Sequence, residues 1–428
     1  MMKQIQTVLL GFGNRGGIYA DHSLDYPDEM NIIAVIEINP FRLEEAKKRY
    51  NVADDMAFTD LDEFLKRKIP CDLVINAVMD EMHYITAMKI LKAGYNMLLE
   101  KPITPDPREL LEIRDTANAN GCNVFVGHVL RYTPFYSTIK ALIERGEIGE
   151  IYTIEMDEHV ALPHFVDSFV RGKWHDENEC GSPLLLSKCC HDTDLMCWLN
   201  SGASPVKVWS FGSQSKFNKN RKPDGAADYC YKCPYERTCV YSATKLHLGF
   251  DCFPFQTWEK IRKPLEEITK EEKAEFLKHD NYGKCVYDAG FTLVDRQTMS
   301  VEFDNGSLVS FTLVGGTAKG ERYISIAGEK GEIKGYFEEG KIHLYKLVIN
   351  EEGKYIPTDT VIDVNDEIVS NIYGGHGGGD FALIRDVIRF LNGERENLSI
   401  TSINDSVKGH LLVYAAEKSR KTNTVANV

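Results

Sequence analysis

The chain has 428 residues, of which 43% are hydrophobic, and this length predicts two domains because it exceeds what one hydrophobic core ordinarily holds. Its net charge of −14 argues against nucleic acid and anionic membranes as partners, since both are polyanions, and no apolar stretch reaches the roughly 18 residues of a membrane-spanning helix. The eleven cysteines, in a chain where we recognise no export signal, predict reduced thiols and a cytoplasmic location.

A glycine-rich loop follows the first apolar run, 7–10, and precedes a helix-compatible segment. In that setting it predicts a dinucleotide site: Gly11 permits a tight turn, Gly13 admits a pyrophosphate and Gly16 allows close helix packing. Glu37 ends the next apolar run, where a carboxylate binds ribose hydroxyls and repels a 2′-phosphate; the alternative is a solvated strand end. This favours NAD, and nearby Arg42 keeps NADP as the less favoured cofactor. The predicted contacts here are Gly11, Gly13, Asn14, Arg15, Gly16 and Glu37.

Residues 1–127 alternate short apolar runs with amphipathic stretches, which predicts an N-terminal Rossmann domain, a doubly wound parallel sheet of the α/β class. Gly94 and the pair Asn120-Gly121 follow two of the amphipathic stretches, as is typical of helix ends. The strands are expected at 5–10, 32–37, 72–78, 95–100 and 122–127, and the helices at 40–50, 61–66, 83–93 and 108–119.

The pattern changes after residue 128, where several alternating runs follow one another. They predict a C-terminal α+β domain, 128–428, with a large, mostly antiparallel open sheet for substrate binding and oligomerisation. Residues 215–290 interrupt it as a cysteine-containing insertion. We expect helices at 135–145, 184–199, 380–391 and 401–421, and strands at 150–160, 205–212, 298–303, 308–314, 323–327, 331–337 and 341–347.

Four of the insertion's cysteines form the series Cys230-x2-Cys233-x5-Cys239-x12-Cys252. Tetrahedral zinc takes four thiolates with a close first pair, which the Cys-x2-Cys step supplies. The later spacings match no standard zinc knuckle. The series therefore leaves two alternatives, a structural zinc ion or unmetallated thiols.

Longer motifs then give the chain a family resemblance. Glu100-Lys101-Pro102 follows an apolar run, Asn76-Ala77-Val78 ends the previous one, and 127–132 and 189–195 carry further motifs with His128 and His191. The chain resembles the glucose-fructose oxidoreductase, inositol dehydrogenase and MocA (Gfo/Idh/MocA) family over nearly its whole length. Ser187 replaces the aspartate that many such dehydrogenases carry four residues before the histidine. Gly-His-Gly-Gly-Gly-Asp at 375–380 resembles the family's NAD-dependent glycosidases.

The resemblance implies that Lys101 orients the substrate hydroxyl and that His191, with an ordinary pKa near 6.5, is the general base. Lys188, three residues earlier, would share the face of His191 and is a third catalytic candidate. The alternatives are a solvated lysine at 101, a structural histidine at 191 and a plain ion pair at 188. The resemblance adds Ala77, His83, Glu100 and Lys101 as cofactor contacts and His128, Arg131, Tyr132 and His191 as substrate contacts; Tyr282 and His376 are further substrate candidates.

The expected function is an NAD-dependent oxidoreductase that moves a hydride between a ring carbon of a sugar, inositol or related polyol and the nicotinamide. One alternative is a redox-neutral glycosidase that oxidises, eliminates, adds water and reduces again. Another is a non-catalytic NAD- or sugar-binding regulator. An open sheet with one uncovered face predicts a homodimer or homotetramer. The sequence leaves the sugar, the carbon oxidised and the direction of flux open.

Overall fold

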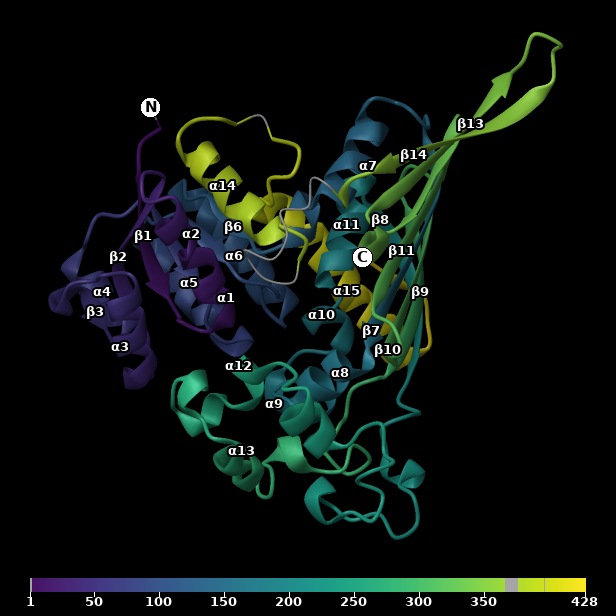
Figure 1. The fold of residues 1–428 in the computed structure, drawn as a ribbon. Coiled ribbons are helices and arrows are strands. Elements are labelled where there is room, and N and C mark those ends of the chain that lie inside the picture. Colours follow the sequence, from purple (N-terminus) through teal and green to yellow (C-terminus); the bar gives the residue numbers. More distant parts are fainter. Residues whose placement is uncertain (1, 366–375, 396) are drawn as a thin grey trace.

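The first of two β-sheets in the computed structural model is a six-stranded parallel sheet (Figure 1). The structure describes residues 2–365, 376–395 and 397–428. The strand order β3-β2-β1-β4-β5-β6 is that of a Rossmann fold, so the predicted fold class of this part is confirmed. β3 was not predicted, because two residues give no periodic signal. The strands are β1 Ile5–Leu10, β2 Met30–Ile36, β3 Ala57–Phe58, β4 Leu73–Asn76, β5 Met97–Leu99 and β6 Val124–Val126.

Helices connect these strands, and their ends follow local sequence rules. Asn39, Asp60 and Asp106 each accept a hydrogen bond from the backbone N–H two residues ahead and so begin a helix. Gly121 ends the longest of them with a φ of +64°. The helices are α1 Asn14–Ala20, α2 His22–Asp25, α3 Pro40–Arg49, α4 Leu61–Arg67, α5 His83–Lys92 and α6 Pro107–Asn120.

The second sheet has nine strands in the order β14-β13-β12-β11-β7-β10-β9-β8-β15. Only the β7–β10 pair is parallel among its described pairs, which confirms a mostly antiparallel sheet. Buried and exposed residues alternate strictly in β9, so one face of this strand packs on the core and the other faces outward. The strands are β7 Ile151–Ala161, β8 Pro205–Ser213, β9 Arg296–Phe303, β10 Leu308–Thr317, β11 Glu321–Gly328, β12 Gly331–Tyr336, β13 Lys341–Ile349, β14 Tyr355–Asp363 and β15 Ala426–Asn427.

The helix expected over 184–199 is interrupted in the structure. It ends at Ser187 and begins again at Cys190, so that Lys188 and Cys189 lie between two helices. No glycine or proline marks this break, and the apolar pattern runs through it. The remaining helices are α7 Pro134–Glu144, α8 Leu162–Phe165, α9 Glu177–Cys180, α10 Leu184–Ser187, α11 Cys190–Leu199, α12 Pro254–Thr257, α13 Lys270–Phe276, α14 Gly379–Leu391 and α15 Ile403–Thr422.

The C-terminal helices return to the first sheet. Leu383 and Val387 of α14 are buried in the same apolar cluster as Ile5 and Leu9 of β1. Thr401, just before α15, donates through its hydroxyl to the backbone carbonyl of β6. Figure 1 shows α14 in yellow beside the purple and blue elements of the Rossmann part. The segment that contains His376 is therefore carried to the glycine-rich loop.

The insertion folds into short helices around a small core of its own. Trp258, Ile268, Leu277 and Tyr282 form that core. Figure 1 shows the insertion in teal and green, below the two sheets in that view. None of the described helices is both long enough and apolar enough to cross a membrane.

Candidate functional site

The glycine-rich loop lies between the ends of β1 and β4, where the strand order of the first sheet reverses. Gly11 has a φ of +88°, and a Cβ there would lie 2.7 Å from the Ala77 carbonyl oxygen. A Cβ on Gly16 would lie 2.0 Å from the carbonyl oxygen of Gly11. Around Gly13, in contrast, no protein heavy atom lies within 4 Å of such a Cβ. The loop therefore fits a phosphate group that approaches the backbone at Gly13.

Glu37 is held beside this loop at the end of β2. Its carboxylate accepts hydrogen bonds from the backbone N–H of Phe12 at 2.8 Å and of Asn39 at 2.9 Å. Arg42, the residue that favoured NADP, is paired at 2.8 Å with Glu259 of the insertion. Glu37 thus stands where the adenosine ribose of a cofactor is expected, and Arg42 is already paired with Glu259.

Arg15 has carboxylate partners rather than a free side chain. Its guanidinium donates to Glu100 at 2.7 Å and to Asp380 at 2.5 Å. Burial favours the neutral acid at Glu100, but Arg15 and then Lys101 outweigh it and lower the pKa of that carboxyl. Because Asp380 belongs to α14, this pair ties the C-terminal part of the chain to the loop. Asn14 is the first residue of α1, beside Arg15.

Lys101 and His191 approach each other from the two parts of the chain. Lys101 follows β5, and its Nζ donates to the Ser187 carbonyl at 3.3 Å, at the end of α10. His191 lies in the first turn of α11. Burial lowers the pKa of His191 well below 6.5, and the Lys101 charge lowers it further. The imidazole is therefore neutral near pH 7 and able to accept a proton.

Two other predicted histidines surround His191. Its ring centroid lies 5.6 Å from that of His128 and 6.0 Å from that of His376. His376 Nδ1 lies 3.0 Å from Asp380 Oδ2, in hydrogen-bonding contact. Both ring nitrogens of His128 are buried and have no hydrogen-bond partner among the described residues. Gly375, the first residue of the Gly-His-Gly-Gly-Gly-Asp motif at 375–380, lies outside the described residues.

Arg131 and Tyr132 are engaged within the protein. The Arg131 guanidinium donates twice to Asp194, both at 2.6 Å, and only 2% of the arginine is exposed. The Tyr132 hydroxyl accepts from the backbone N–H of Thr401 at 3.1 Å. Asp194 is therefore the buried counter-charge of Arg131. Both predicted substrate residues connect elements around the site.

Lys188 forms an ion pair, one of the two interpretations of the sequence. Its Nζ lies 3.2 Å from Glu158, which also binds Arg322 at 2.7 Å. Arg322 in turn binds Asp192 at 2.9 Å. Burial raises the pKa of Asp192 to about 6, although Arg322 opposes this rise. Lys188 is thus bound into a largely buried charge network that includes Asp192, the residue after His191.

The other predicted contacts take local roles in the described structure. His83 donates through a ring N–H to the Pro102 carbonyl at 2.7 Å and so holds the turn that carries Lys101. The Ala77 N–H donates to the β1 carbonyl of Leu10 at 2.9 Å. Tyr282 lies in the insertion's own core, with its ring centroid 5.6 Å from that of His247.

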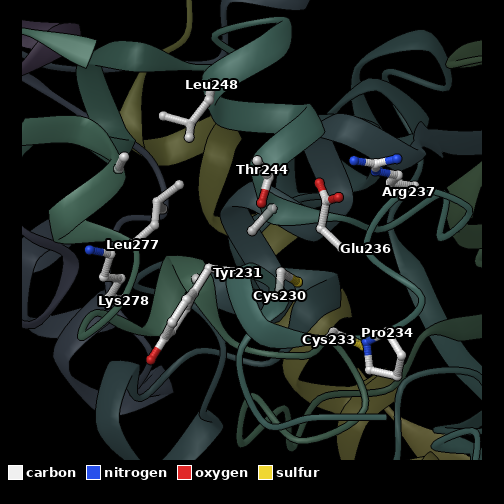
Figure 2. A pocket seen from close by; sticks show the side chains of 13 residues that line it. Cys230, Tyr231, Cys233, Pro234, Glu236, Arg237, Thr244, Leu248, Leu277 and Lys278 are labelled. Atoms are coloured by element: carbon white, nitrogen blue, oxygen red, sulfur yellow. The ribbon is translucent and has the colours of Figure 1, made fainter. Parts of the chain in front are cut away.

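Of the two alternatives for Cys230, Cys233, Cys239 and Cys252, the structural zinc ion is not supported. Among the described residues, no group of three or more His, Cys, Asp or Glu side chains could hold a metal ion. Cys230, Cys233 and Cys239 line one small cavity, but Cys252 does not. Cys252 was included because it is the next cysteine after Cys239 in the sequence. In the fold it does not line the cavity that the other three share. A larger pocket of about 470 Å³ also lies in the insertion (Figure 2), and neither Lys101 nor His191 lines it.

Three residues near the site were not predicted from the sequence. Burial lowers the pKa of half-buried His164 well below 6.5, and the charges of Lys188 and Lys101 lower it further. His410 of α15 accepts the Ile103 N–H at 3.1 Å through Nε2. Arg322 lies in β11. Each comes from an element far along the chain, so no local motif indicates it.

Comparison with known proteins gives matches over almost the whole chain. A family model described as the oxidoreductase family, NAD-binding Rossmann fold, matches residues 5–128. The model of the C-terminal alpha/beta domain of that oxidoreductase family matches residues 140–428. The YteT protein of Bacillus subtilis (strain 168) is 23% identical over 374 residues, which are 83% of this chain and 81% of that protein.

Further relatives are more distant or partial. The inositol 2-dehydrogenase of Corynebacterium glutamicum (strain R) is 27% identical over 209 residues, 49% of this chain and 57% of that enzyme. The WlbA dehydrogenase of Bordetella pertussis, solved with NADH and UDP-GlcNAcA, has a TM-score of 0.67 at 16% identity, covering 100% of this chain and 98% of that one. A levoglucosan dehydrogenase solved with NADH and levoglucosan has a TM-score of 0.69 at 15% identity, covering 99% of both chains. At these identities the structural matches show a shared fold.

Proposed function

Because the chain belongs to the Gfo/Idh/MocA oxidoreductase family in both its NAD-binding and its C-terminal part, we propose that it is an NAD-dependent sugar or polyol dehydrogenase. The substrate carbon is a ring CH–OH of a sugar, inositol or related polyol. The dehydrogenases among its relatives support this class over a glycosidase or a non-catalytic regulator. We assign NAD binding to residues 1–127 and substrate binding mainly to residues 128–428.

The approach of Lys101 to His191 is the observation that carries this proposal. Lys101 follows a strand at the carboxyl edge of the Rossmann sheet, the edge at which such sheets bind ligands. Its contact with the Ser187 carbonyl brings its ammonium to the element that precedes His191. In alcohol oxidation a neutral imidazole can take the hydroxyl proton, and an ammonium donor can hold the substrate oxygen.

Lys101, His191 and His376 have different roles in the proposed reaction. A bound NAD would supply a nicotinamide ring as the acceptor of the hydride from the substrate carbon. Lys101 donates a hydrogen bond to the substrate oxygen and stabilises negative charge as the proton leaves. His191 accepts that proton, because its lowered pKa keeps it neutral. His376, oriented by Asp380, binds a second hydroxyl of the ring.

Glu37 supports NAD as the cofactor. Its carboxylate would repel a 2′-phosphate, and Glu259 neutralises Arg42. The loop at Gly13 leaves room for the diphosphate. Glu37 and the paired Arg42 therefore favour a cofactor with a free ribose hydroxyl over one with a 2′-phosphate.

We also propose that two copies of the chain associate through the outer face of the second sheet. Trp209, Phe211 and Leu308 are exposed on β8 and β10. Trp209 pairs with Ser300 and Phe211 with Thr298, residues that are also exposed, so these side chains lie on one face. Light scattering at micromolar protein should give at least a dimer, and Phe211→Glu should shift it toward monomer. A monomeric wild type would contradict this.

A combined assay tests the activity. Purified protein is incubated with NAD and a panel of free sugars, inositols and aryl glycosides while NADH and released aglycone are recorded together. We expect NADH to accumulate without aglycone, whereas aglycone release without net NADH would refute the dehydrogenase. Lys101→Ala and His191→Ala should each lower turnover at least ~10²-fold with little change in NAD affinity. Lys92→Ala and His279→Ala, at exposed positions, are the matched controls.

A further inference from the structure

A row of four rings connects the Rossmann part of the chain with the insertion. It consists of Trp174, Phe169, His164 and Phe253, whose ring centroids are 5.9, 5.9 and 5.0 Å apart in that order, with neighbouring ring planes tilted by 32°, 33° and 37°. We propose that this row, the aromatic wall, binds the C–H face of the substrate ring and that Phe253 of the insertion completes it. The inference rests on the proposed function, which gives a sugar or polyol ring as the substrate.

One end of the aromatic wall is fixed at the edge of the Rossmann sheet where the cofactor is expected. The Trp174 indole N–H donates to Asp80 Oδ2 at 3.1 Å. Asp80 lies in the turn after β4, one of the two strands between whose ends the glycine-rich loop lies. Dinucleotides bind at the carboxyl ends of these strands. This end of the wall therefore belongs to the proposed active site.

The aromatic wall also lies close to the proposed catalytic lysine. Burial lowers the pKa of His164 and of Lys173, the residue before Trp174, and the charge of Lys101 lowers both further. A charge acts on a neighbouring group in this way only over short distances. Lys101 therefore lies within electrostatic reach of both His164 and the Trp174 end of the wall.

Part of the aromatic wall is accessible to a ligand. Phe169 is only 3% exposed, whereas Trp174, His164 and Phe253 are each half-buried. Phe169 thus fills the inside of the row, and the other three rings keep surface that a ligand can cover. A sugar ring presents C–H bonds on the face from which its hydroxyls point away, and an aromatic surface suits such an apolar face.

The insertion holds Phe253 in a conformation that phenylalanine rarely adopts. Its φ of +47° and ψ of +52° are left-handed, and Asp251, two residues earlier, has a φ of +48°. Such strain persists only where the surrounding structure imposes it, and it is concentrated at functional sites. The Asp251 carboxylate accepts from the Trp258 indole at 2.8 Å and from Lys273 at 2.8 Å. These contacts fix the backbone that carries the Phe253 ring.

Two further hydrogen bonds join the segment after Phe253 to the segment before Phe169. The Thr257 hydroxyl donates to Asp167 at 2.9 Å, and the Ser168 hydroxyl donates to Gln256 Oε1 at 3.2 Å. Figure 1 shows α12, which follows Phe253, close to α8, which contains His164. The contact of Phe253 with His164 is therefore part of a docked surface rather than of a free loop tip.

The aromatic wall and the polar residues would contribute differently to the reaction. Lys101 and His191 act on the reacting hydroxyl, whereas the wall contacts only C–H bonds. Binding of that kind is equal in the ground state and the transition state, so its loss raises KM and leaves kcat nearly unchanged. The wall also favours six-membered rings with mainly equatorial hydroxyls, because an axial hydroxyl would separate the ring from it.

Steady-state kinetics with the panel sugar that wild type oxidises fastest tests the proposal. We expect Phe253→Ala to raise KM at least ~5-fold with kcat within about threefold and the Kd for NAD unchanged, and Phe253→Tyr to keep the wild-type KM. Phe250→Ala, at a position of the insertion that is 78% exposed, is the matched control and should behave as wild type. An unchanged KM in Phe253→Ala, or a fall in kcat at unchanged KM, would overturn the proposal.

Phe253→Gly covers the case in which Phe253→Ala does not fold. Glycine adopts the left-handed conformation freely, so this variant removes the ring and also relieves the backbone strain. Its Tm should be at least that of Phe253→Ala, and its KM should rise to the same extent. A wild-type KM in Phe253→Gly would overturn the proposal.

Calorimetric titration of NADH-saturated protein with the same panel separates this proposal from the proposed function, because no hydride acceptor is then present. Weaker binding to Phe253→Ala than to wild type supports the aromatic wall, whether or not the sugar is oxidised. Oxidation by wild type with equal binding to both proteins would overturn the wall and leave the dehydrogenase. Wild-type protein that binds none of the panel would overturn both. A preference for aryl glycosides that Phe253→Ala abolishes would assign the wall to the aglycone and refute the sugar ring as its ligand.

Discussion

Replacing Gly13 by alanine should weaken NAD binding without unfolding the chain. Gly13 has a φ of −88° and a ψ of −173°, which alanine adopts without strain, and its Cβ would meet no protein atom within 4 Å. The added methyl group would, however, occupy the space through which a diphosphate approaches the backbone. We expect the Kd for NAD to rise at least ~10-fold, about 1.4 kcal/mol, and Tm to change by less than ~2 °C.

Two neighbouring glycines provide matched controls. At Gly16 a Cβ would lie 2.0 Å from the carbonyl oxygen of Gly11, so the backbone must shift by more than about 1 Å to reach ordinary contact. Gly16→Ala should therefore cost about 1–3 kcal/mol of stability as well as NAD affinity. At Gly17 the nearest atom, Phe12 Cε2, is 3.5 Å away, and Gly17→Ala should stabilise the helix by about 0.5–1 kcal/mol.

Calorimetric titration with NAD and thermal denaturation of the three variants separate these outcomes. The reasoning is refuted if Gly13→Ala binds NAD with wild-type affinity. A loss of NAD binding in Gly17→Ala equal to that in Gly13→Ala would also refute it, because the effect would then not depend on the space beside the loop.

Three further predictions concern residues around the loop and the proposed base. Burial and the charge of Lys101 lower the pKa of His191 well below 6.5. The value of kcat/KM for alcohol oxidation should therefore not decline as the pH falls to 6.5. A pH profile with a midpoint at or above 6.5, which His191→Gln abolishes, would contradict this. Asp194→Asn leaves the buried Arg131 guanidinium without its carboxylate and should lower the unfolding free energy by about 3–5 kcal/mol in urea, whereas a loss below ~1 kcal/mol would contradict the pairing. Glu259→Gln should raise kcat/KM with NADP several-fold and leave that with NAD nearly unchanged, because Arg42 then becomes free to meet a 2′-phosphate; unchanged use of NADP would exclude this role for Glu259.

Much of the fold follows from local patterns in the sequence. Five of the six Rossmann strands and the spacing from the glycine loop to Glu37 were predicted, because buried parallel strands are continuous apolar runs and the loop requires glycine. β14 escaped prediction because nearly all of it is exposed, so no alternation of apolar and polar residues marks it. β15 is too short to give a pattern.

The candidate site was predictable only where one motif carries the chemistry. Lys101 and His191 lie in such motifs, and the structure places them on adjacent elements. His164 and His410 carry no motif, and their place near the site comes from elements distant in the chain. The roles proposed for the site residues and the boundary after residue 127 remain predictions.

The sequence by itself determined most of the longer helices and strands, the family and the chemical groups available, because periodicity, glycine positions and short motifs act over a few neighbouring residues. Only the tertiary structure decided which groups meet. In the fold Arg15 forms an ion pair with Asp380, and Lys188 forms one with Glu158. Cys285, and not Cys252, lines the same cavity as Cys230. These contacts form because a buried charge must be paired and because segments distant in the chain lie side by side in the fold. The spacing of residues in the sequence indicates neither.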